Sequence, residues 1–240
     1  MKPTIRLTCL QRTRMLRASM RRAIAAVTGI WMLATAAHME AQTMRLGEVL
    51  TMVALDAAPP PGTKGAVFQA DRGSHKGQYL LVSSSARTVV STPLEGRASE
   101  YRLLSPETVG MLPDVDVLGI HYIKVRADRA EAFEQFVART LHPAMANLRP
   151  DLRLLYYKAV AGPEAGSYIA LFALTQQSRD KYWPGGSDSD DLREAFAPVQ
   201  PLTKELSTYL VEGSALTDTK FAAAVFESKT WTDFVLVAPK

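Results

Sequence analysis

The sequence predicts an α+β protein in which one strand–helix–strand–strand–helix–strand unit occurs twice, first in a degenerate form and then intact. The C-terminal half predicts the intact unit, because its apolar residues follow strand and helix periods in that order. The N-terminal half shares with it a glycine turn of the pattern G-x-x-x-G-x-Y, which begins at Gly73 in the first half and at Gly162 in the second. We expect the two units to associate as an α/β-barrel-like pair.

Residues 1–41 are predicted to be an export signal that is removed. Residues 1–22 carry seven basic side chains and no acidic one, and an apolar run of 15 residues follows from Ala23 to Ala37. This run is shorter than the roughly 20 residues that cross a bilayer, and a basic segment before a short apolar one is typical of signal peptides. We therefore expect a periplasmic or secreted protein with no stable membrane span after the signal is removed.

The charge of the chain changes when this signal is set aside. Seven of the 28 basic residues but only one of the 24 acidic residues lie in it, which leaves 21 basic and 23 acidic side chains and a net charge near −2. Without a basic surface nothing attracts the domain to nucleic acid. Cys9 is the single cysteine and also lies in the signal, so the rest of the chain has no thiol for a disulfide, a nucleophile or a metal site.

The intact unit is predicted from the periods of the second half. The run VLGIHYIKV at 117–125 is β-rich and ends at a charged break, which favours a strand. In the next segment Phe133, Val137 and Leu141 recur at helical spacing with charges opposite them. A later helix begins with Asp188 in a pattern that resembles a capping box. In order, we expect a strand at 117–125, a helix at 127–145, strands at 152–160 and 167–175, a helix from Asp188 to Tyr209 kinked at Pro198 and Pro201, and a strand at 231–237.

The first half repeats this order of elements with one helix missing. The two glycine turns are 89 residues apart, whereas LGEVLTM at 46–52 resembles LGIHYIK at 118–124 with an offset of 72. The difference of 17 residues is close to the length of the first expected helix, and the proline-rich segment 55–65 stands in its place. We interpret the chain as an internal duplication, with a degenerate half at 42–95, a linker at 96–116 and an intact half at 117–240.

The second half resembles a known superfamily in the stretches HYIKVRADRAEAFEQFVARTLHPAM, LRLLYYKAV, GSYIALFAL and SRDKYWP. These are similar to the dimeric α/β-barrel superfamily, which includes antibiotic-biosynthesis monooxygenases, EthD-type proteins and NIPSNAP proteins, and in which two ferredoxin-like units press sheet against sheet. The resemblance implies that fold but leaves function open, since the superfamily holds oxygenases, isomerases, haem enzymes and members without known chemistry. His142 is followed directly by Pro143, which departs from the His-x-Pro spacing of the EthD-type pattern.

The candidate catalytic residues are His121 and His142, either of which could act as a general base in an aromatic pocket. No H-x-x-x-H or H-x-x-E-H pair occurs in the sequence, and we predict neither a metal nor a cofactor. The alternative is that both histidines are hydrogen-bonded core residues, with His142 near a helix end.

Aromatic and basic residues of the second half are the candidate ligand-binding residues. Within their strands, Tyr122 and Lys124 share one face, and so do Tyr156 and Lys158. On one common sheet face they would line a pocket between sheet and helices. The alternative is a core of amphipathic tyrosines with lysines at the strand ends. With one strand residue and one turn residue added, the full set is Tyr122, Lys124, Tyr156, Lys158, Tyr168 and Trp183.

These features favour an exported protein that binds a small aromatic or apolar molecule in an aromatic-lined pocket of the C-terminal half. The alternative is a cofactor-independent monooxygenase or isomerase of the same fold that acts on such a molecule, and whether the protein is an enzyme stays open. The glycine turns join strand to strand and are not expected to hold phosphate, because a phosphate loop leads from a strand into a helix. The missing helix of the first half leaves a homodimer open.

Overall fold

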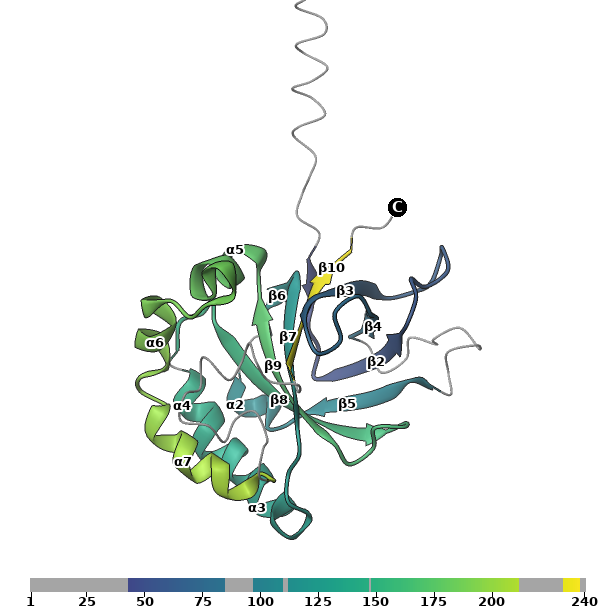
Figure 1. The fold of residues 1–240 in the computed structure, drawn as a ribbon. Coiled ribbons are helices and arrows are strands. Elements are labelled where there is room, and N and C mark those ends of the chain that lie inside the picture. Colours follow the sequence, from purple (N-terminus) through teal and green to yellow (C-terminus); the bar gives the residue numbers. More distant parts are fainter. Residues whose placement is uncertain (1–42, 85–96, 110–111, 147, 212–230, 238–240) are drawn as a thin grey trace, which may run out of the picture. The chain divides into compact units, whose positions relative to one another are not determined.

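Eight antiparallel strands close into a barrel in the order β10-β3-β4-β2-β5-β8-β9-β7 (Figure 1). The computed structural model describes residues 43–84, 97–109, 112–146, 148–211 and 231–237, and the expected export signal lies outside them. The barrel strands are β2 (Val49–Leu55), β3 (Ala66–Gly73), β4 (Tyr79–Ser83), β5 (Ser99–Leu103), β7 (Val117–Ile123), β8 (Arg153–Ala161), β9 (Tyr168–Leu174) and β10 (Trp231–Leu236). Two short strands, β1 (Met44–Arg45) and β6 (Asp114–Val115), form a separate pair.

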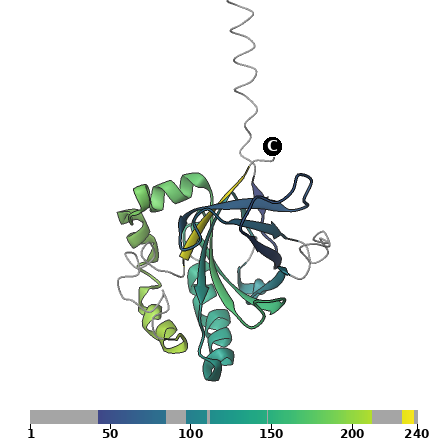
Figure 2. The same ribbon diagram turned by 45° about the vertical axis from the view of Figure 1, so that its right-hand side comes forward.

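The helices gather on one side of the barrel, over the outer face of β7, β8 and β9 (Figures 1 and 2). No helix in the described part of the chain is long and apolar enough to cross a membrane. The helical segments are α2 (Pro106–Val109), η2 (Ala127–Arg129), α3 (Ala130–Phe136), η3 (Val137–Leu141), α4 (His142–Ala146), α5 (Gln176–Tyr182), η4 (Pro184–Gly186), α6 (Asp190–Phe196) and α7 (Gln200–Tyr209).

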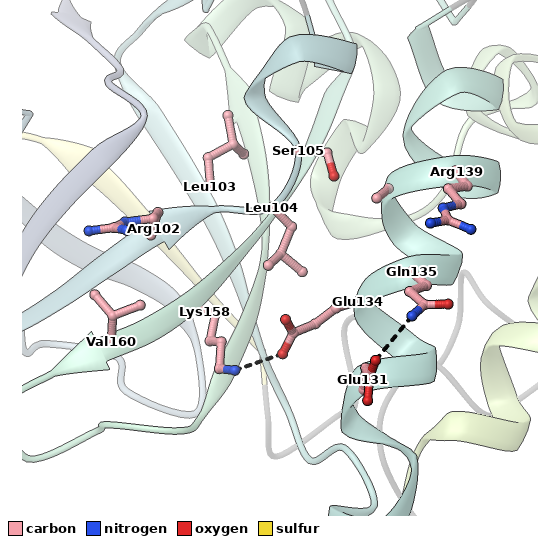
Figure 3. Close-up of a pocket in the computed structure, with 11 residues that line it drawn as sticks. Arg102, Leu103, Leu104, Ser105, Glu131, Glu134, Gln135, Arg139, Lys158 and Val160 are labelled. Atoms are coloured by element: carbon pink, nitrogen blue, oxygen red, sulfur yellow. Dashed lines mark hydrogen bonds and ion pairs between the residues drawn. The ribbon is translucent and has the colours of Figure 1, made fainter.

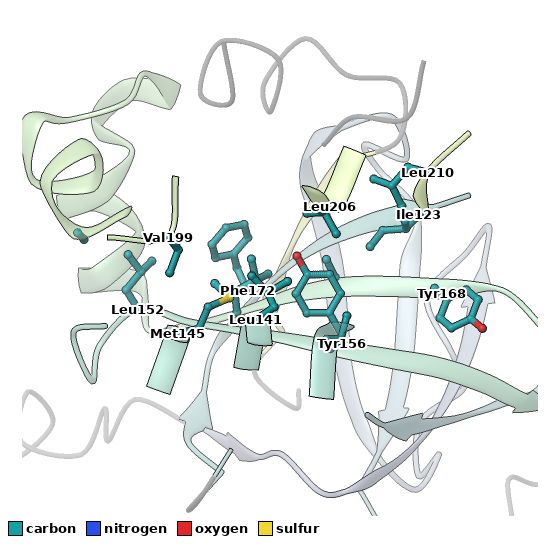
Figure 4. Packing of buried hydrophobic residues seen from close by; sticks show 14 of the residues in the cluster. Ile123, Leu141, Met145, Leu152, Tyr156, Tyr168, Phe172, Val199, Leu206 and Leu210 are labelled. Carbon is teal, nitrogen blue, oxygen red and sulfur yellow. The ribbon is translucent and has the colours of Figure 1, made fainter. Parts of the chain in front are cut away.

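Alternation along the strands sorts the buried apolar side chains into two main cores. On β7, Leu118 and Ile120 belong to the core inside the barrel, whereas Val117 and Ile123 belong to the core between the sheet and the helices. Figure 4 shows the second core, in which Phe172 of β9 and residues of the helices pack together. A strand buried on both faces explains why β9 is apolar throughout.

The helix expected at 127–145 is present but contains a π-helical turn, η3. Pro143 accounts for this turn, because proline has no N–H and its ring would clash with the carbonyl four residues earlier in a regular α-helix. The N–H of His142 instead donates to the carbonyl of Val137, five residues earlier. Phe133, Val137 and Leu141, the expected apolar stripe, are all buried.

Three features of the segment after β9 differ from expectation. The helix α5 was not expected, because its sequence QQSRDKY carries no apolar stripe. Ser189, and not Asp188, caps α6, since its hydroxyl accepts from the N–H of Leu192 at 3.1 Å. The expected kink at Pro198 and Pro201 is a break, which separates α6 from α7.

The strands of the two halves pair in the same order, β3-β4-β2-β5 in the first and β8-β9-β7-β10 in the second. The hairpin turns after β3 and β8 also have equivalent backbone hydrogen bonds. The N–H of Gly77 donates to the carbonyl of Ala70 at 2.8 Å, and 89 residues later the N–H of Gly166 donates to that of Ala159 at 2.8 Å. As expected, both glycine turns join strand to strand.

The pairing corrects one step of the sequence comparison. Leu55 pairs with Tyr79 and Ile123 pairs with Tyr168, so β2 and β7 correspond with an offset of 68 and not 72. The offset of 72 came from matching two Leu-Gly pairs that do not occupy equivalent register positions. A register shift also interrupts both strand pairs that join the halves, β5 with β8 and β10 with β3.

The strand bounds also test what was expected of two connecting segments. Between β2 and β3 the chain contains no helix at 56–65, as expected from its prolines. The segment 96–116 differs from the expected linker, because it contains β5, a barrel strand that pairs with both β2 and β8. The first four-stranded half therefore extends to Leu103.

Candidate functional site

The pairing register decides which predicted residues share a sheet face. His121, Ala170 and Tyr156 are aligned across β7, β9 and β8, so their side chains lie on the outer face, under the helices. Tyr122 lies on the opposite face and packs against the core inside the barrel. The expected grouping of Tyr122 with Tyr156 on one face is therefore wrong, because alternation fixes faces only within a strand.

Both candidate catalytic histidines are buried between the sheet and the helices. His121 is fully buried beside Phe172, and His142 is 2% exposed beside Tyr156. Nε2 of His142 accepts a hydrogen bond from the backbone N–H of Tyr156 at 3.3 Å. Burial lowers the pKa of His121 to about 3 and that of His142 to about 4, so both rings are neutral at pH 7. Neither histidine lines a pocket described below.

Two expected ligand-binding residues, Lys158 and Tyr168, meet on one carboxylate of α3. Oε1 of Glu134 accepts a hydrogen bond from Nζ of Lys158 at 2.7 Å and another from the hydroxyl of Tyr168 at 2.5 Å. Nζ of Lys158 also lies 5.7 Å from the centre of the Tyr168 ring. The three side chains come from α3, β8 and β9, and each restrains the other two.

This cluster borders a groove of about 510 Å³ between the helix α3–η3 and the strands β5 and β8. Figure 3 shows Leu104, Lys158 and Glu134 pointing toward one another between the strands and the helix. We call this space the helix–strand groove. It is lined by Arg102, Leu103, Leu104, Ser105, Glu131, Glu134, Gln135, Ala138, Arg139, Lys158 and Val160.

The charges in the helix–strand groove are largely balanced. Lys158 and Glu134 are each about one-third exposed and neutralise one another. Burial, followed by the hydrogen bond and the charge of Glu134, raises the pKa of Tyr168, so its hydroxyl is a neutral donor. Arg102 and Arg139 lie on opposite rims of the groove (Figure 3). The groove thus offers an apolar wall beside a preformed polar pair, which suits a small molecule with both characters.

The remaining predicted residues lie away from the groove. Lys124 is exposed after the end of β7, and Tyr156 is buried in the core under the helices. Trp183 is 4% exposed and packs against Phe172 and Tyr182 in that same core. Of the six residues, the structure brings only Lys158 and Tyr168 to one polar cluster.

Sequence reasoning missed two parts of the groove. Glu134 lies on the charged side of the first helix, where a solvated face was expected, and nothing in its local sequence marks it as a partner of two strands. Arg102 and Leu104 lie in a segment that was expected to be a linker. Only the strand pairing of β5 with β8 could have placed them beside Lys158.

In the described part of the chain, no group of three His, Cys, Asp or Glu side chains is arranged to hold a metal ion. No sequence family matches the chain, and no curated protein matches it. Among solved structures, an anthrone oxidase-like protein has a TM-score of 0.40 at 10% identity, over 82% of this chain and 95% of that one. A major regulator of staphylococcal pathogenesis has a TM-score of 0.38 at 10% identity, over 80% of this chain and 99% of that one. Likenesses of this size establish no family.

Proposed function

We propose that the protein binds a small, partly apolar molecule in the helix–strand groove, between α3–η3 and β8 of the C-terminal half and β5 of the first half. The observation that carries this proposal is the Lys158–Glu134 pair, which is held in place by Tyr168 and faces an open groove of about 510 Å³. A polar pair that is ordered before binding loses little conformational entropy when a ligand arrives. The site therefore suits recognition of a small molecule.

The groove suggests how such a molecule lies. Its apolar part packs on Leu104 and on Val160, whose side chain is unusually exposed at 42% for a large apolar residue. Its polar group hydrogen-bonds to the ammonium of Lys158, which has three donors. Each such hydrogen bond to a charged group contributes roughly 1.5–3 kcal/mol.

The placement of the histidines favours binding over catalysis. A general base must reach the proton that it abstracts, and His121 and His142 are buried away from the groove. The groove holds carboxylates, but Glu134 is already occupied by two hydrogen-bond donors. A monooxygenase or isomerase reaction would have to rely on other residues.

Identification of a bound compound tests this proposal. The protein, purified from its native host, is denatured, and any released compound is identified by mass spectrometry and titrated back by calorimetry. Ala138→Trp places an indole in the groove and should weaken rebinding at least tenfold. The control Ala197→Trp alters an exposed alanine between α6 and α7 and should not. The proposal fails when no compound is retained, or when both variants bind it equally.

We also propose that residues 1–41 direct export and that the two halves are duplicated ferredoxin-like units. The charge pattern of the N-terminus supports the first proposal, and mass spectrometry of the protein from its host tests it. The shared strand order and turn hydrogen bonds support the second. Replacing GSHKG at 73–77 with GPEAG from 162–166 should leave the barrel folded, with a change in stability of no more than about 1 kcal/mol. Loss of folding would argue against equivalent halves.

A further inference from the structure

The two ends of the barrel differ. At one end the β1–β6 pair places Met44 and Val115 in the core inside the barrel and closes it. At the opposite end, where Pro163 and Glu164 of the second glycine turn lie, a pocket of about 260 Å³ opens between inward-facing side chains. We call this pocket the barrel mouth. Its apolar lining includes Met52, Leu80, Ile120 and Ile169.

The barrel mouth lies where the two halves contribute equivalent residues. With the offset of 68 between β2 and β7, Met52 corresponds to Ile120 and Ala54 corresponds to Tyr122. All four line the pocket. The large side chain of Tyr122 therefore has only a methyl group as its counterpart.

Equivalent turn positions carry different side chains near the barrel mouth. The backbone N–H of Glu164 donates to Oγ of Ser99 at 3.1 Å, and the backbone N–H of His75 donates to Oγ1 of Thr232 at 3.2 Å. The same local contact thus presents a carboxylate in one half and an imidazole in the other. Glu164 lines the barrel mouth, whereas the ring of His75 packs edge-on against Tyr122, with ring centres 5.3 Å apart.

Two tyrosine hydroxyls at the barrel mouth stay neutral and lie within the influence of Glu164. Burial and then the charge of Glu164 raise the pKa of Tyr101 to about 12, against a hydrogen bond with Ser167 that lowers it. Burial, followed by Tyr101 and Glu164, raises the pKa of Tyr122. Arg97, an exposed residue, also lines the pocket, so the feature that favours a cation is the pair of tyrosine rings beside the Glu164 carboxylate.

We propose that the barrel mouth is a second binding site, separate from the helix–strand groove, for a primary amine carried on a single ring. The ring packs on Met52 and fills the space beside Ala54. The ammonium group lies near Tyr101 and Tyr122, toward the carboxylate of Glu164, because aromatic rings and carboxylates both attract ammonium ions. An apolar cavity of about 150 Å³ holds benzene, so 260 Å³ accommodates a ring with a short amine chain.

Three probes of similar size and different charge test this site by calorimetry on the full chain at pH 7. They are 2-phenylethylamine, which is a cation, 2-phenylethanol, which is neutral, and 3-phenylpropionate, which is an anion. The amine should bind, the alcohol should bind at least tenfold more weakly, and the anion should show no binding. The proposal is overturned when the alcohol or the anion binds as tightly as the amine, or when none of the three binds.

Two variants locate the binding. Ala54→Phe fills the pocket and should weaken the amine and the alcohol alike, by tenfold or more. Glu164→Gln removes the charge and should weaken only the amine, while the matched control Glu194→Gln, which alters an exposed residue of α6 paired with Arg149, should change neither. Ala54 and Glu164 are exposed, so circular dichroism should show both variants folded. Equal amine binding by the Glu164 and Glu194 variants, or normal binding by Ala54→Phe, would rule the site out.

Discussion

The guanidinium of Arg179 lies 3.9 Å from the carboxylate of Asp233, at the seam where β10 meets β3. The same Nη1 atom contacts the carboxylate of Asp71 at 2.8 Å. Arg179 comes from α5, and it and Asp233 are 6% and 3% exposed. One buried cation therefore ties the helical layer to the strand pair that closes the barrel.

Removal of that cation should destabilise the whole fold. Arg179→Met removes the cation that contacts the carboxylates of Asp71 and Asp233, and loss of one member of a buried ion pair costs about 3–5 kcal/mol. We expect a loss near the lower limit, because Asp71 is 40% exposed. The control is Arg193→Met, which removes an exposed pair with Asp190 and should cost less than about 1 kcal/mol. Urea unfolding at pH 7 measures both, and similar losses would contradict the structural role of Arg179.

Asp233 predicts a dependence of stability on pH. Burial raises the pKa of its carboxyl to about 7, with Arg179 opposing and Asp71 adding to the rise. The folded chain then holds a proton that the unfolded chain releases near pH 4, so the contribution of Asp233 to the free energy of unfolding falls as the pH rises from about 4 to 7. Asp233→Asn should match the unchanged chain near pH 4 and exceed its stability at pH 8. An equal difference between the two proteins at pH 4 and pH 8 would exclude this linkage.

Much of the second half could be predicted, because its elements have clear periods. The expected strand at 167–175 is β9, at Tyr168–Leu174, and the expected helix at 127–145 is α3 through α4. The helix α5 could not be predicted, since it has no apolar stripe. It is held in place by the buried side chains of Arg179 and Tyr182 and begins at Thr175, whose side chain accepts from the N–H of Ser178.

The candidate site was harder to predict than the strands. A strand's own alternation shows that Tyr122 and His121 face opposite ways, but it does not show which of them shares a face with Tyr156. That depends on register, which the pairing of β7, β9 and β8 sets. The partner of Lys158 could not be found either, because Glu134 is close to it only after α3 packs over β8.

The buried histidines predict a dependence of stability on pH that is opposite to that of Asp233. Burial lowers the pKa of His121 to about 3 and that of His142 to about 4. A histidine that is neutral in the folded chain and protonated in the unfolded chain reduces the free energy of unfolding as the pH falls below about 6.5. In NMR titrations, the imidazole signals of both should keep their neutral positions down to about pH 5. The variants His121→Asn and His142→Asn assign the signals, and a midpoint above pH 6 for either would contradict the burial argument.

The hydrogen bond between Tyr168 and Glu134 should appear as coupling in a double-mutant cycle. At 2.5 Å from a carboxylate, it should contribute about 1 kcal/mol after the partial exposure of Glu134 is considered. The cycle uses Tyr168→Phe, Glu134→Gln and the double variant. The control cycle uses Tyr209 and Glu205, whose contact on α7 is longer at 3.1 Å, and its coupling should be below about 0.5 kcal/mol. Equal coupling in the two cycles would show that the cluster beside the groove is not specially ordered.

The glycine turns predict that alanine substitutions cost different amounts of stability at glycines that look alike in sequence. Gly77 and Gly166 have φ of +90° and +89°, and a Cβ at either would meet nothing within 4 Å. Alanine at either position is destabilised only by the left-handed backbone conformation, which costs about 1–2 kcal/mol. The two variants should therefore lose similar amounts of stability. Gly162 has φ of +87°, but its Cβ would lie 2.1 Å from the carbonyl oxygen of Ala98. Since that atom is backbone just before β5, Gly162→Ala should cost at least about 2 kcal/mol more. Thermal or urea unfolding of the three variants decides this, and a loss at Gly162 no larger than at Gly166 would mean that β5 does not approach the turn so closely.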